Sequence, residues 1–216
     1  MKICGVEEAG RGPVIGPLVM CGLLIDDSKE HELKTIGAKD SKLLTPSQRE
    51  GLYGKILKLT EKHKIIILQP DTIDDAVQSK TNNLNWLEAE TSAEIINELS
   101  PDVAYIDCPS PNIPAYTKRL QSMVKGKVKL IAEHKADVNY PIVSAASIIA
   151  KVTRDREIEK LKAKVGINFG SGYPADPITK EFLKKYHNKF PGLFRKSWAP
   201  FKKALSNKKQ SSLEKW

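Results

Sequence analysis

Acidic residues stand at the carboxyl ends of apolar stretches that are typical of β-strands. Glu7 and Glu8 close the first such stretch, Asp107 closes another, and Asp137 follows shortly after a stretch that ends at Ala132. In open α/β sheets, binding and catalytic groups collect outside the carboxyl ends of the strands. Taken singly, a strand-end acid is more often a solvated surface residue. Taken together, the four are expected to converge at one edge of a sheet.

Four converging carboxylates would repel one another unless cations lay between them. Oxygen-only ligand sets favour Mg²⁺ or Mn²⁺, and a pair of such ions suits phosphodiester displacement, in which one activates water and the other steadies the leaving oxygen. Because successive strand residues point to opposite faces, Glu7 and Glu8 can share a metal pair only if the strand ends near them. The glycine-rich turn at Gly10 is expected to end it.

A short turn, Gly10-Arg11-Gly12, follows the first acidic pair. It lacks the third glycine of a dinucleotide-binding fingerprint, since Ile15 stands there, and it lacks the Gly-Lys-Ser/Thr ending of a Walker loop. Two glycines around an arginine can instead bring bare backbone against a sugar or phosphate while the guanidinium binds a phosphate. A generic tight turn would explain the glycines but not the arginine.

The positive charge of the chain is concentrated at its C-terminal end. Residues 180–216 hold eleven Lys or Arg and two Glu, a surplus of nine that equals the formal net charge of +9 for the whole chain. Aromatic residues alternate with these lysines, a composition typical of a surface that follows a phosphate backbone. A solvated helical face with its aromatics packed inward is the alternative.

The elements that must position these residues alternate between strands and helices. A cap at Thr45, with Pro46 and Gln48 behind it, predicts a helix to about His63. We expect strands over residues 2–6, 14–25, 65–68, 103–107 and 128–132, and further helices from Asp71, over 84–99, 115–124 and 143–164. The alternation predicts an α/β catalytic domain, residues 1–170, followed by a helical, basic, substrate-binding segment, residues 171–216.

Length and composition set further limits. The chain has 216 residues, of which 40% are hydrophobic and 28% charged, as expected for one globular domain or one domain with an appendage. No apolar run reaches the ~20 residues that a bilayer requires, and the residues after Met1 leave no room for a secretory signal. Three cysteines without a Cys-x-x-Cys pair argue against a disulfide framework or a structural zinc site. We expect a cytoplasmic protein with no membrane partner.

Seven short segments, taken together, have a distinctive order along the chain. The segments are residues 5–17 (GVEEAGRGPVIGP), 39–42 (KDSK), 83–85 (NLN), 105–107 (YID), 133–137 (EHKAD), 144–151 (SAASIIAK) and 170–177 (GSGYPADP). They resemble, in the same order and over nearly the whole chain, one known family, the type 2 ribonucleases H named ribonuclease HII. The segment at 133–137 resembles the archaeal and eukaryotic branch.

This resemblance implies an endonuclease on a ribonuclease H-like fold, a mixed sheet flanked by helices. It implies cleavage of the RNA strand of RNA–DNA hybrids and incision at single ribonucleotides in duplex DNA, leaving a 3′-hydroxyl and a 5′-phosphate. It also implies a monomer with two Mg²⁺ or Mn²⁺ ions on four catalytic, metal-binding acids. By the same resemblance, the acids are Glu7, Glu8, Asp107 and Asp137, and the substrate-binding residues are Gly10, Arg11, Gly12, Lys39, Ser41, Lys42, Ser144, Ser147, Lys151 and Tyr173.

The resemblance assigns particular tasks to the turn and to Tyr173. Gly10, Arg11 and Gly12 would contact the 2′-hydroxyl of the ribonucleotide and a flanking phosphate, and Tyr173 would stack on the sugar of the next deoxynucleotide. The chemistry agrees, because the 2′-hydroxyl is the group that distinguishes RNA from DNA. A DNA-directed nuclease or strand-transfer enzyme on the same scaffold would keep the carboxylates but leave this turn and Tyr173 unexplained.

One residue departs from the family pattern. The family has Asp where this chain has Glu7. The added methylene moves the carboxylate by about one C–C bond, whereas metal sites tolerate only ~0.5 Å of error. Either the surroundings have adjusted to the longer side chain, or the protein binds RNA–DNA junctions without cutting them efficiently.

Overall fold

The computed structural model describes residues 1–38 and 41–213, without the side chains of Lys42 and of residues 207–213. The chain divides into two compact units. Unit 1 comprises Met1–Ala9, Val19–Ile67 and Leu84–Arg154. Unit 2 comprises Gly10–Leu18, Leu68–Asn83 and Asp155–Trp216. The compact units therefore do not divide near Gly170, because residues 10–18, 68–83 and 155–170, which all come before or at that position, fold with the C-terminal part. A functional division at Gly170 stays a prediction.

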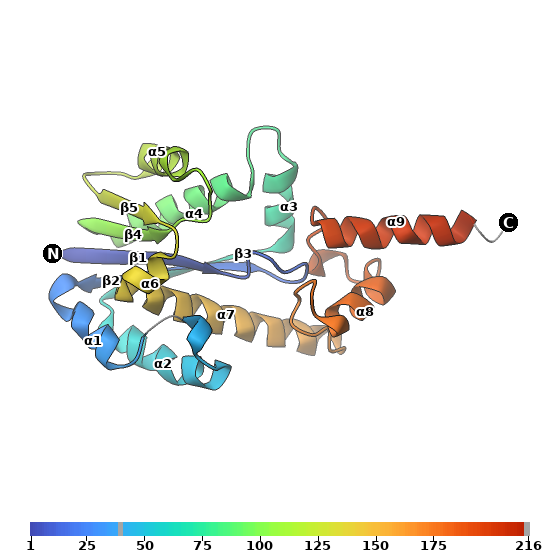
Figure 1. Cartoon of the computed structure of the whole chain (residues 1–216), viewed down its shortest axis with the longest axis horizontal. Helices are drawn as coiled ribbons and strands as arrows, with labels where there is room; N and C mark the ends of the chain where they lie inside the picture. Colours follow the sequence, from blue (N-terminus) through green and yellow to red (C-terminus); the bar gives the residue numbers. More distant parts are fainter. Residues whose placement is uncertain (39–40, 214–216) are drawn as a thin grey trace. The chain divides into compact units, whose positions relative to one another are not determined.

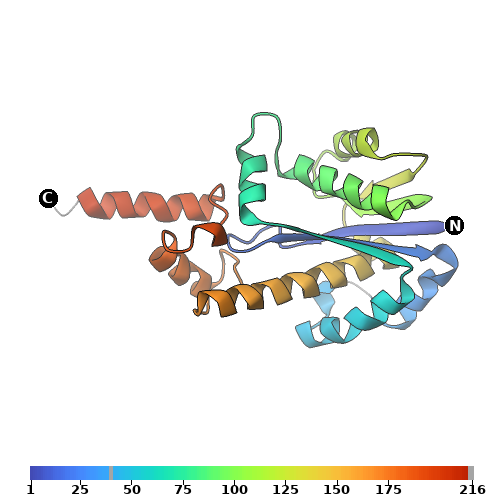
Figure 2. The same cartoon turned by 180° about the vertical axis from the view of Figure 1, so that it is seen from behind.

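Unit 1 is built on a mixed sheet. Its five strands lie in the order β3-β2-β1-β4-β5, with β1 antiparallel to β2 and parallel to β4, and β4 parallel to β5. Figure 1 shows α4 (Leu84–Leu99) and α5 (Ile113–Met123) on one face of this sheet, and Figure 2 shows the same from behind. The other face carries α1 (Glu30–Thr35), α2 (Pro46–Leu59) and α7 (Pro141–Val165). The strands are β1 (Lys2–Ala9), β2 (Leu18–Asp26), β3 (Lys62–Leu68), β4 (Val103–Asp107) and β5 (Lys129–Glu133).

The helices of unit 1 follow the expected positions closely. The Thr45 hydroxyl accepts a hydrogen bond from the Gln48 amide, and the Gln48 side chain accepts one from the Thr45 amide, so the predicted capping box begins α2. The helices are α1 (Glu30–Thr35), α2 (Pro46–Leu59), α4 (Leu84–Leu99), α5 (Ile113–Met123), α6 (Ala136–Asn139) and α7 (Pro141–Val165), the last of which continues into unit 2.

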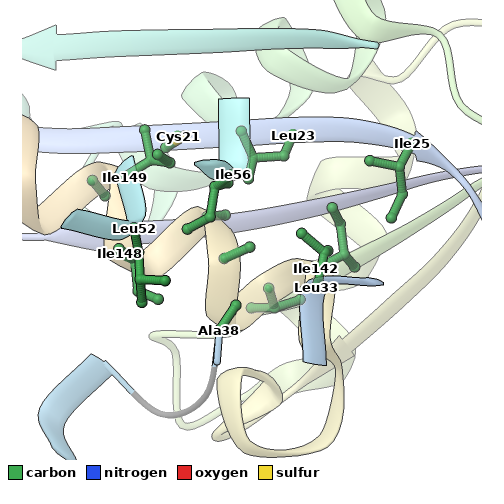
Figure 3. Close-up of a cluster of buried hydrophobic side chains, with 14 of the residues drawn as sticks. Cys21, Leu23, Ile25, Leu33, Ala38, Leu52, Ile56, Ile142, Ile148 and Ile149 are labelled. Atoms are coloured by element: carbon green, nitrogen blue, oxygen red, sulfur yellow. The ribbon is translucent and has the colours of Figure 1, made fainter. Parts of the chain in front are cut away.

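Close packing against both faces fixes the position of the central strands. A Cβ added at Gly5 of β1 would lie 2.6 Å from the Ile142 backbone of α7, and one at Gly22 of β2 would collide with Ile95 of α4. Figure 3 shows the core on the α7 face, where side chains of β2 meet those of α2 and α7. Burial of this apolar surface stabilises unit 1 and holds the carboxyl ends of β1 and β4 in place.

Unit 2 is mostly helical. It contains α3 (Pro70–Gln78), α8 (Pro177–Tyr186) and α9 (Ala199–Leu213), together with the turn that follows β1. The strand expected over 14–25 begins only at Leu18, because Gly16 has a φ of +83° and Pro17 follows it. Residues 14–17 instead make a short bridge between Ile15 and Phe194. In the part of the chain that the structure describes, no helix is long and apolar enough to cross a membrane.

Candidate active site

Glu7 and Asp107 occupy equivalent positions on neighbouring parallel strands. Val6 of β1 lies opposite Ile106 of β4, and the two acids come one residue later at the carboxyl ends. Residues at the same register of parallel strands point to the same face. Glu7 is buried and Asp107 half-buried, so the sheet brings both carboxyl groups to one edge of unit 1.

Asp137 is brought to the same edge by α6. The Ala136 amide donates to Asp107 Oδ1 at 2.9 Å, so α6, which begins at Ala136, starts beside Asp107 with Asp137 as its second residue. Lys135, which precedes the helix, has a left-handed backbone with a φ of +60°, which turns the chain sharply after β5. Asp137 is 2% exposed. Three predicted acids, from β1, β4 and α6, therefore gather at this edge.

Glu8 leaves β1 on the opposite face from Glu7, although burial raises the pKa of the Cys108 thiol at the end of β4 and the charges of Asp107 and Glu8 raise it further. Strand pairing continues beyond Glu8 to Ala9, which lies opposite Val19, so the turn at Gly10 does not end the strand at the acidic pair as expected. Glu7 and Glu8 therefore alternate across the sheet. Electrostatics agree: burial raises the pKa of the Cys21 thiol on the α7 face, and the charges of Cys4 and Glu7 raise it further.

The Glu8 side lies toward α4 and α5. Burial raises the pKa of the Tyr116 hydroxyl, Ser92 opposes this through a hydrogen bond, and the charges of Glu8 and Glu88 raise it again. Glu88 is fully buried on α4, a residue that sequence reasoning missed. The sequence could have indicated this burial, because Glu88 lies four residues after Leu84 and so falls on the apolar face of that helix.

The connection from β5 to α6 is held by a second set of hydrogen bonds. The Tyr140 hydroxyl donates to Glu133 Oε1 at 2.8 Å, and Asn139 Nδ2 donates to Glu133 Oε2 at 3.1 Å. The Tyr140 ring stacks on Tyr105 at 4.1 Å between centroids. His134 Nδ1 donates to the Cys108 carbonyl at 2.9 Å. These contacts fix α6, and with it Asp137, against the ends of β4 and β5.

The donor chemistry of the gathered acids fits a hard divalent cation. Carboxylate oxygens are the ligands that Mg²⁺ and Mn²⁺ prefer, and two of the three acids are largely removed from water. Within residues 1–38 and 41–213, however, no three His, Cys, Asp or Glu side chains are already grouped closely enough to bind one metal ion. The edge therefore supplies carboxylate groups of the kind that Mg²⁺ and Mn²⁺ bind, but the described side chains are not arranged as a set of three ligands around one ion.

Three of the predicted substrate-binding residues form a polar cluster in unit 1. Lys151 Nζ donates to Ser41 Oγ at 2.6 Å and to Ser147 Oγ at 2.9 Å, and the two hydroxyls lie 2.9 Å apart. Both serines are fully buried, and the predicted Ser144 is 1% exposed. Lys39 lies outside the described residues, as does the side chain of Lys42.

The predicted ribonucleotide-binding residues lie together in unit 2. The Val14 amide donates to the Gly172 carbonyl at 2.9 Å, which joins the turn after Gly12 to the loop that carries Tyr173. A Cβ at Gly12 would lie 3.6 Å from the Tyr173 ring. Tyr173 is 42% exposed, so its ring is available at the surface beside the turn.

The basic segment separates into two kinds of residue. Its aromatics pack inward: Phe182, Phe194 and Phe201 are buried and contact one another in the core of unit 2. Among its lysines whose side chains the structure describes, Lys184, Lys185, Lys202 and Lys203 are exposed. Arg195, which the sequence groups with these cations, is fully buried against the turn, a placement that nothing in the composition signals.

A mixed five-stranded sheet, helices on both faces and acids at the carboxyl ends of its parallel strands define a ribonuclease H-like fold. The ribonuclease HII family model matches residues 4–201, and the chain belongs to this family of endoribonucleases, whose members depend on divalent metal ions. It is 44% identical to ribonuclease HII of Pyrococcus abyssi over 218 residues, which cover 99% of this chain and 95% of that protein. It is 40% identical to that of Methanosarcina barkeri over 209 residues, with 92% of each covered.

Solved structures agree with this assignment. Ribonuclease H2 from Pyrococcus horikoshii matches with a TM-score of 0.87 and 46% identity, covering 96% of this chain and 98% of that one. The chain in a complex of PCNA with RNase HII from Archaeoglobus fulgidus matches with a TM-score of 0.78 and 43% identity, covering 85% and 86%. A ribonuclease HIII structure with bound Mn²⁺, at 22% identity and a TM-score of 0.79, shares the fold, covering 97% of this chain and 71% of that one.

Proposed function

We propose that this chain cuts the RNA strand of RNA–DNA hybrids and incises duplex DNA at single ribonucleotides, leaving a 3′-hydroxyl and a 5′-phosphate. The observation that carries the proposal is the gathering of Glu7, Asp107 and Asp137 at one sheet edge in a ribonuclease HII chain. Buried like charges at one edge favour a bound cation, and phosphodiester hydrolysis requires charge stabilisation of that kind.

We propose that Glu7, Glu8, Asp107 and Asp137 hold two Mg²⁺ or Mn²⁺ ions, which when bound would activate a water and neutralise charge on the leaving oxygen. The residues of the chain supply the positioning. The Ala136 amide orients Asp107 by donating a hydrogen bond to its carboxylate, and Glu133 anchors the helix that carries Asp137. Glu8 starts from the opposite face, so we expect its removal to cost less than removal of Asp107.

Binding of the substrate is assigned to two sets of residues. In unit 2, Gly10, Arg11 and Gly12 would read the 2′-hydroxyl and a phosphate, and the exposed ring of Tyr173 would stack on a neighbouring sugar. In unit 1, Lys151 would bind a backbone phosphate, with Ser41 and Ser147 orienting its ammonium group. Lys39, Lys42 and Ser144 remain predicted contacts, and the monomeric state remains a prediction.

A catalytically impaired protein is the second candidate, because Glu7 stands where the family has Asp. Glu7 is buried, so its surroundings leave the longer side chain little freedom to move into a new position. Such a protein would bind RNA–DNA junctions and release them uncut. Mg²⁺ demands near-ideal octahedral ligands, so a misplaced carboxylate should impair the Mg²⁺ reaction more than the Mn²⁺ reaction.

One assay separates these candidates. A duplex carrying a single ribonucleotide is incubated with the protein in Mg²⁺, in Mn²⁺ and in excess chelator, beside an all-DNA duplex of the same sequence. We expect incision of the ribonucleotide duplex alone, and none in chelator. Binding without incision in either metal supports the impaired protein. Incision of the all-DNA duplex, or full activity in chelator, contradicts the proposed function.

A further inference from the structure

Arg195 is a fully buried cation that binds the backbone of the Gly10–Gly12 turn from the inside of unit 2. Its guanidinium group donates three hydrogen bonds to main-chain carbonyls: Nη2 to Gly10 at 2.6 Å, Nη1 to Arg11 at 2.9 Å and Nε to Gly16 at 3.1 Å. A buried charge is costly unless hydrogen bonds compensate its lost solvation. The turn provides that compensation, so residue and turn stabilise each other.

These contacts decide which way the amides of the turn point. The described residues contain no cis peptide bond, and in a trans peptide the carbonyl and the following N–H point in opposite directions. Since the Gly10 and Arg11 carbonyls point at the buried guanidinium, the Arg11 and Gly12 amides point away from it. Gly12 is exposed, so this side of the turn can be reached by a ligand. Two successive amides aimed outward form a donor pair suited to an anionic or hydroxyl oxygen.

The guanidinium is itself held firmly. The Arg195 amide donates to the Val14 carbonyl at 2.9 Å, and the Trp198 ring centroid lies 5.0 Å from the guanidinium carbon. The buried Asp74 of α3 accepts hydrogen bonds from the Lys196 amide at 2.7 Å and the Ser197 amide at 2.9 Å, which fixes the backbone immediately after the arginine. Contacts on both sides of Arg195 therefore restrain the position of its donors.

We propose that Arg195 is a positioning residue for ribonucleotide recognition: it holds the carbonyls of the Gly10–Gly12 turn inward so that the amides stay aimed at the 2′-hydroxyl and the adjacent phosphate. This inference rests on the proposed function of the turn. Arginine suits the task because its planar group presents several donors in fixed directions, whereas the compact ammonium of lysine cannot reach three separated carbonyls at once.

The test compares Arg195→Met, Arg195→Lys and the unaltered full chain. Binding to a duplex with one ribonucleotide and to the same all-DNA duplex is measured by fluorescence anisotropy in Ca²⁺, and the ratio of the two affinities is the readout. We expect Arg195→Met to reduce this ratio by roughly 10- to 10²-fold, the scale of one lost hydrogen bond to a charged group. Affinity for all-DNA duplex should change little, and Arg195→Lys should give an intermediate ratio.

A matched control separates positioning from loss of structure. Phe201→Leu removes part of the same unit 2 core without touching the turn, so it should lower the thermal midpoint yet keep the ratio. If Arg195→Met does not fold, Arg195→Lys carries the test alone. A ratio in the variants equal to that of the unaltered chain overturns this inference while leaving the proposed function intact. No preference for the ribonucleotide in the unaltered chain overturns both.

Discussion

The acidic edge of unit 1 and the Gly10–Gly12 turn of unit 2 differ in how their charges are compensated. At the edge, Glu7, Asp107 and Asp137 bring like charges together, and no three acids are yet grouped as ligands within the described part of the chain. At the turn, one buried cation donates to the Gly10 and Arg11 carbonyls, and to the Gly16 carbonyl just beyond it. The proposed metal site at the edge would therefore be completed only by bound cations, whereas hydrogen bonds from Arg195 hold the turn without a ligand.

The sharpest test of the acidic edge is Asp107→Asn. The amide oxygen can still accept the Ala136 hydrogen bond, but the negative charge is removed. We expect the cleavage rate to fall by at least ~10²-fold, and the free energy of unfolding without divalent ions to stay equal or rise, because repulsion at the edge is relieved. Single-turnover cleavage and denaturant unfolding measure the two effects.

The control for that variant is Glu94→Gln, which removes an exposed acid from α4 of the same unit. It should leave cleavage unchanged. Unchanged turnover in Asp107→Asn would show that Asp107 is not a metal ligand. The difference proposed between the acidic edge and the Gly10–Gly12 turn would then be wrong.

Glu7→Asp tests whether the edge is misplaced by the longer side chain. We expect the cleavage rate in Mg²⁺ to rise, by up to ~10²-fold if the displaced carboxylate is the main defect, with a smaller gain in Mn²⁺. Rates in both metals, measured on one ribonucleotide-containing duplex, give the comparison.

Glu8→Asp makes the same chemical change on the opposite face of β1 and should bring no gain. A Glu7→Asp protein that is no faster in either metal would mean that the surroundings have adapted to Glu7.

The exposed lysines of unit 2 should affect affinity and not recognition. Changing Lys184, Lys185, Lys202 and Lys203 to Gln should reduce the salt dependence of duplex binding by about 0.9 units of log–log slope for each phosphate that the protein no longer neutralises. The ratio of affinities for ribonucleotide and all-DNA duplexes should stay constant, since phosphate contacts carry little sugar information. Titrations at several salt concentrations supply both quantities.

Two exposed lysines of unit 1, Lys125 and Lys127, provide the control, because changing both to Gln alters the charge outside the basic segment. An unaltered slope in the four-lysine variant would make that segment a solvated surface.

The smallest expected effect concerns the loop that carries Tyr173. Hydrogen bonds from the Ser171 amide and hydroxyl lower the pKa of Asp176 from 3.8 to about 2. A carboxyl group with a lowered pKa in the folded state contributes stability above its unfolded pKa and loses it as the pH falls through the folded pKa. Between pH 4 and pH 2, Asp176→Asn should therefore lose its stability difference from the unaltered chain.

Denaturant unfolding at several pH values tests this, with Asp75→Asn, an exposed acid of α3, as the control. A stability difference for Asp176→Asn that persists unchanged at pH 2 would show that these hydrogen bonds do not bias the folded state.

Much of the fold follows from local sequence patterns. The capping box at Thr45 and the apolar strands place α2, β3, β4, β5 and α7 within a few residues of their observed bounds, because local backbone preferences and burial agree there. The expectation that residues 14–17 extend a strand is wrong. Their apolar side chains serve the core of unit 2 instead, and the positive φ of Gly16 breaks the extended backbone.

The sequence by itself determined the family, the identities of the acids and the location of the glycine turn, because these depend on residue type and spacing along the chain. Only the tertiary structure decided that Glu7, Asp107 and Asp137 share a face while Glu8 lies on the other, since that depends on strand register. It also decided that Arg195 is buried against the turn and that Glu88 is buried on α4. A charged residue's side chain is expected at the surface unless distant backbone groups replace its water, and those groups are identified only when the chain has folded.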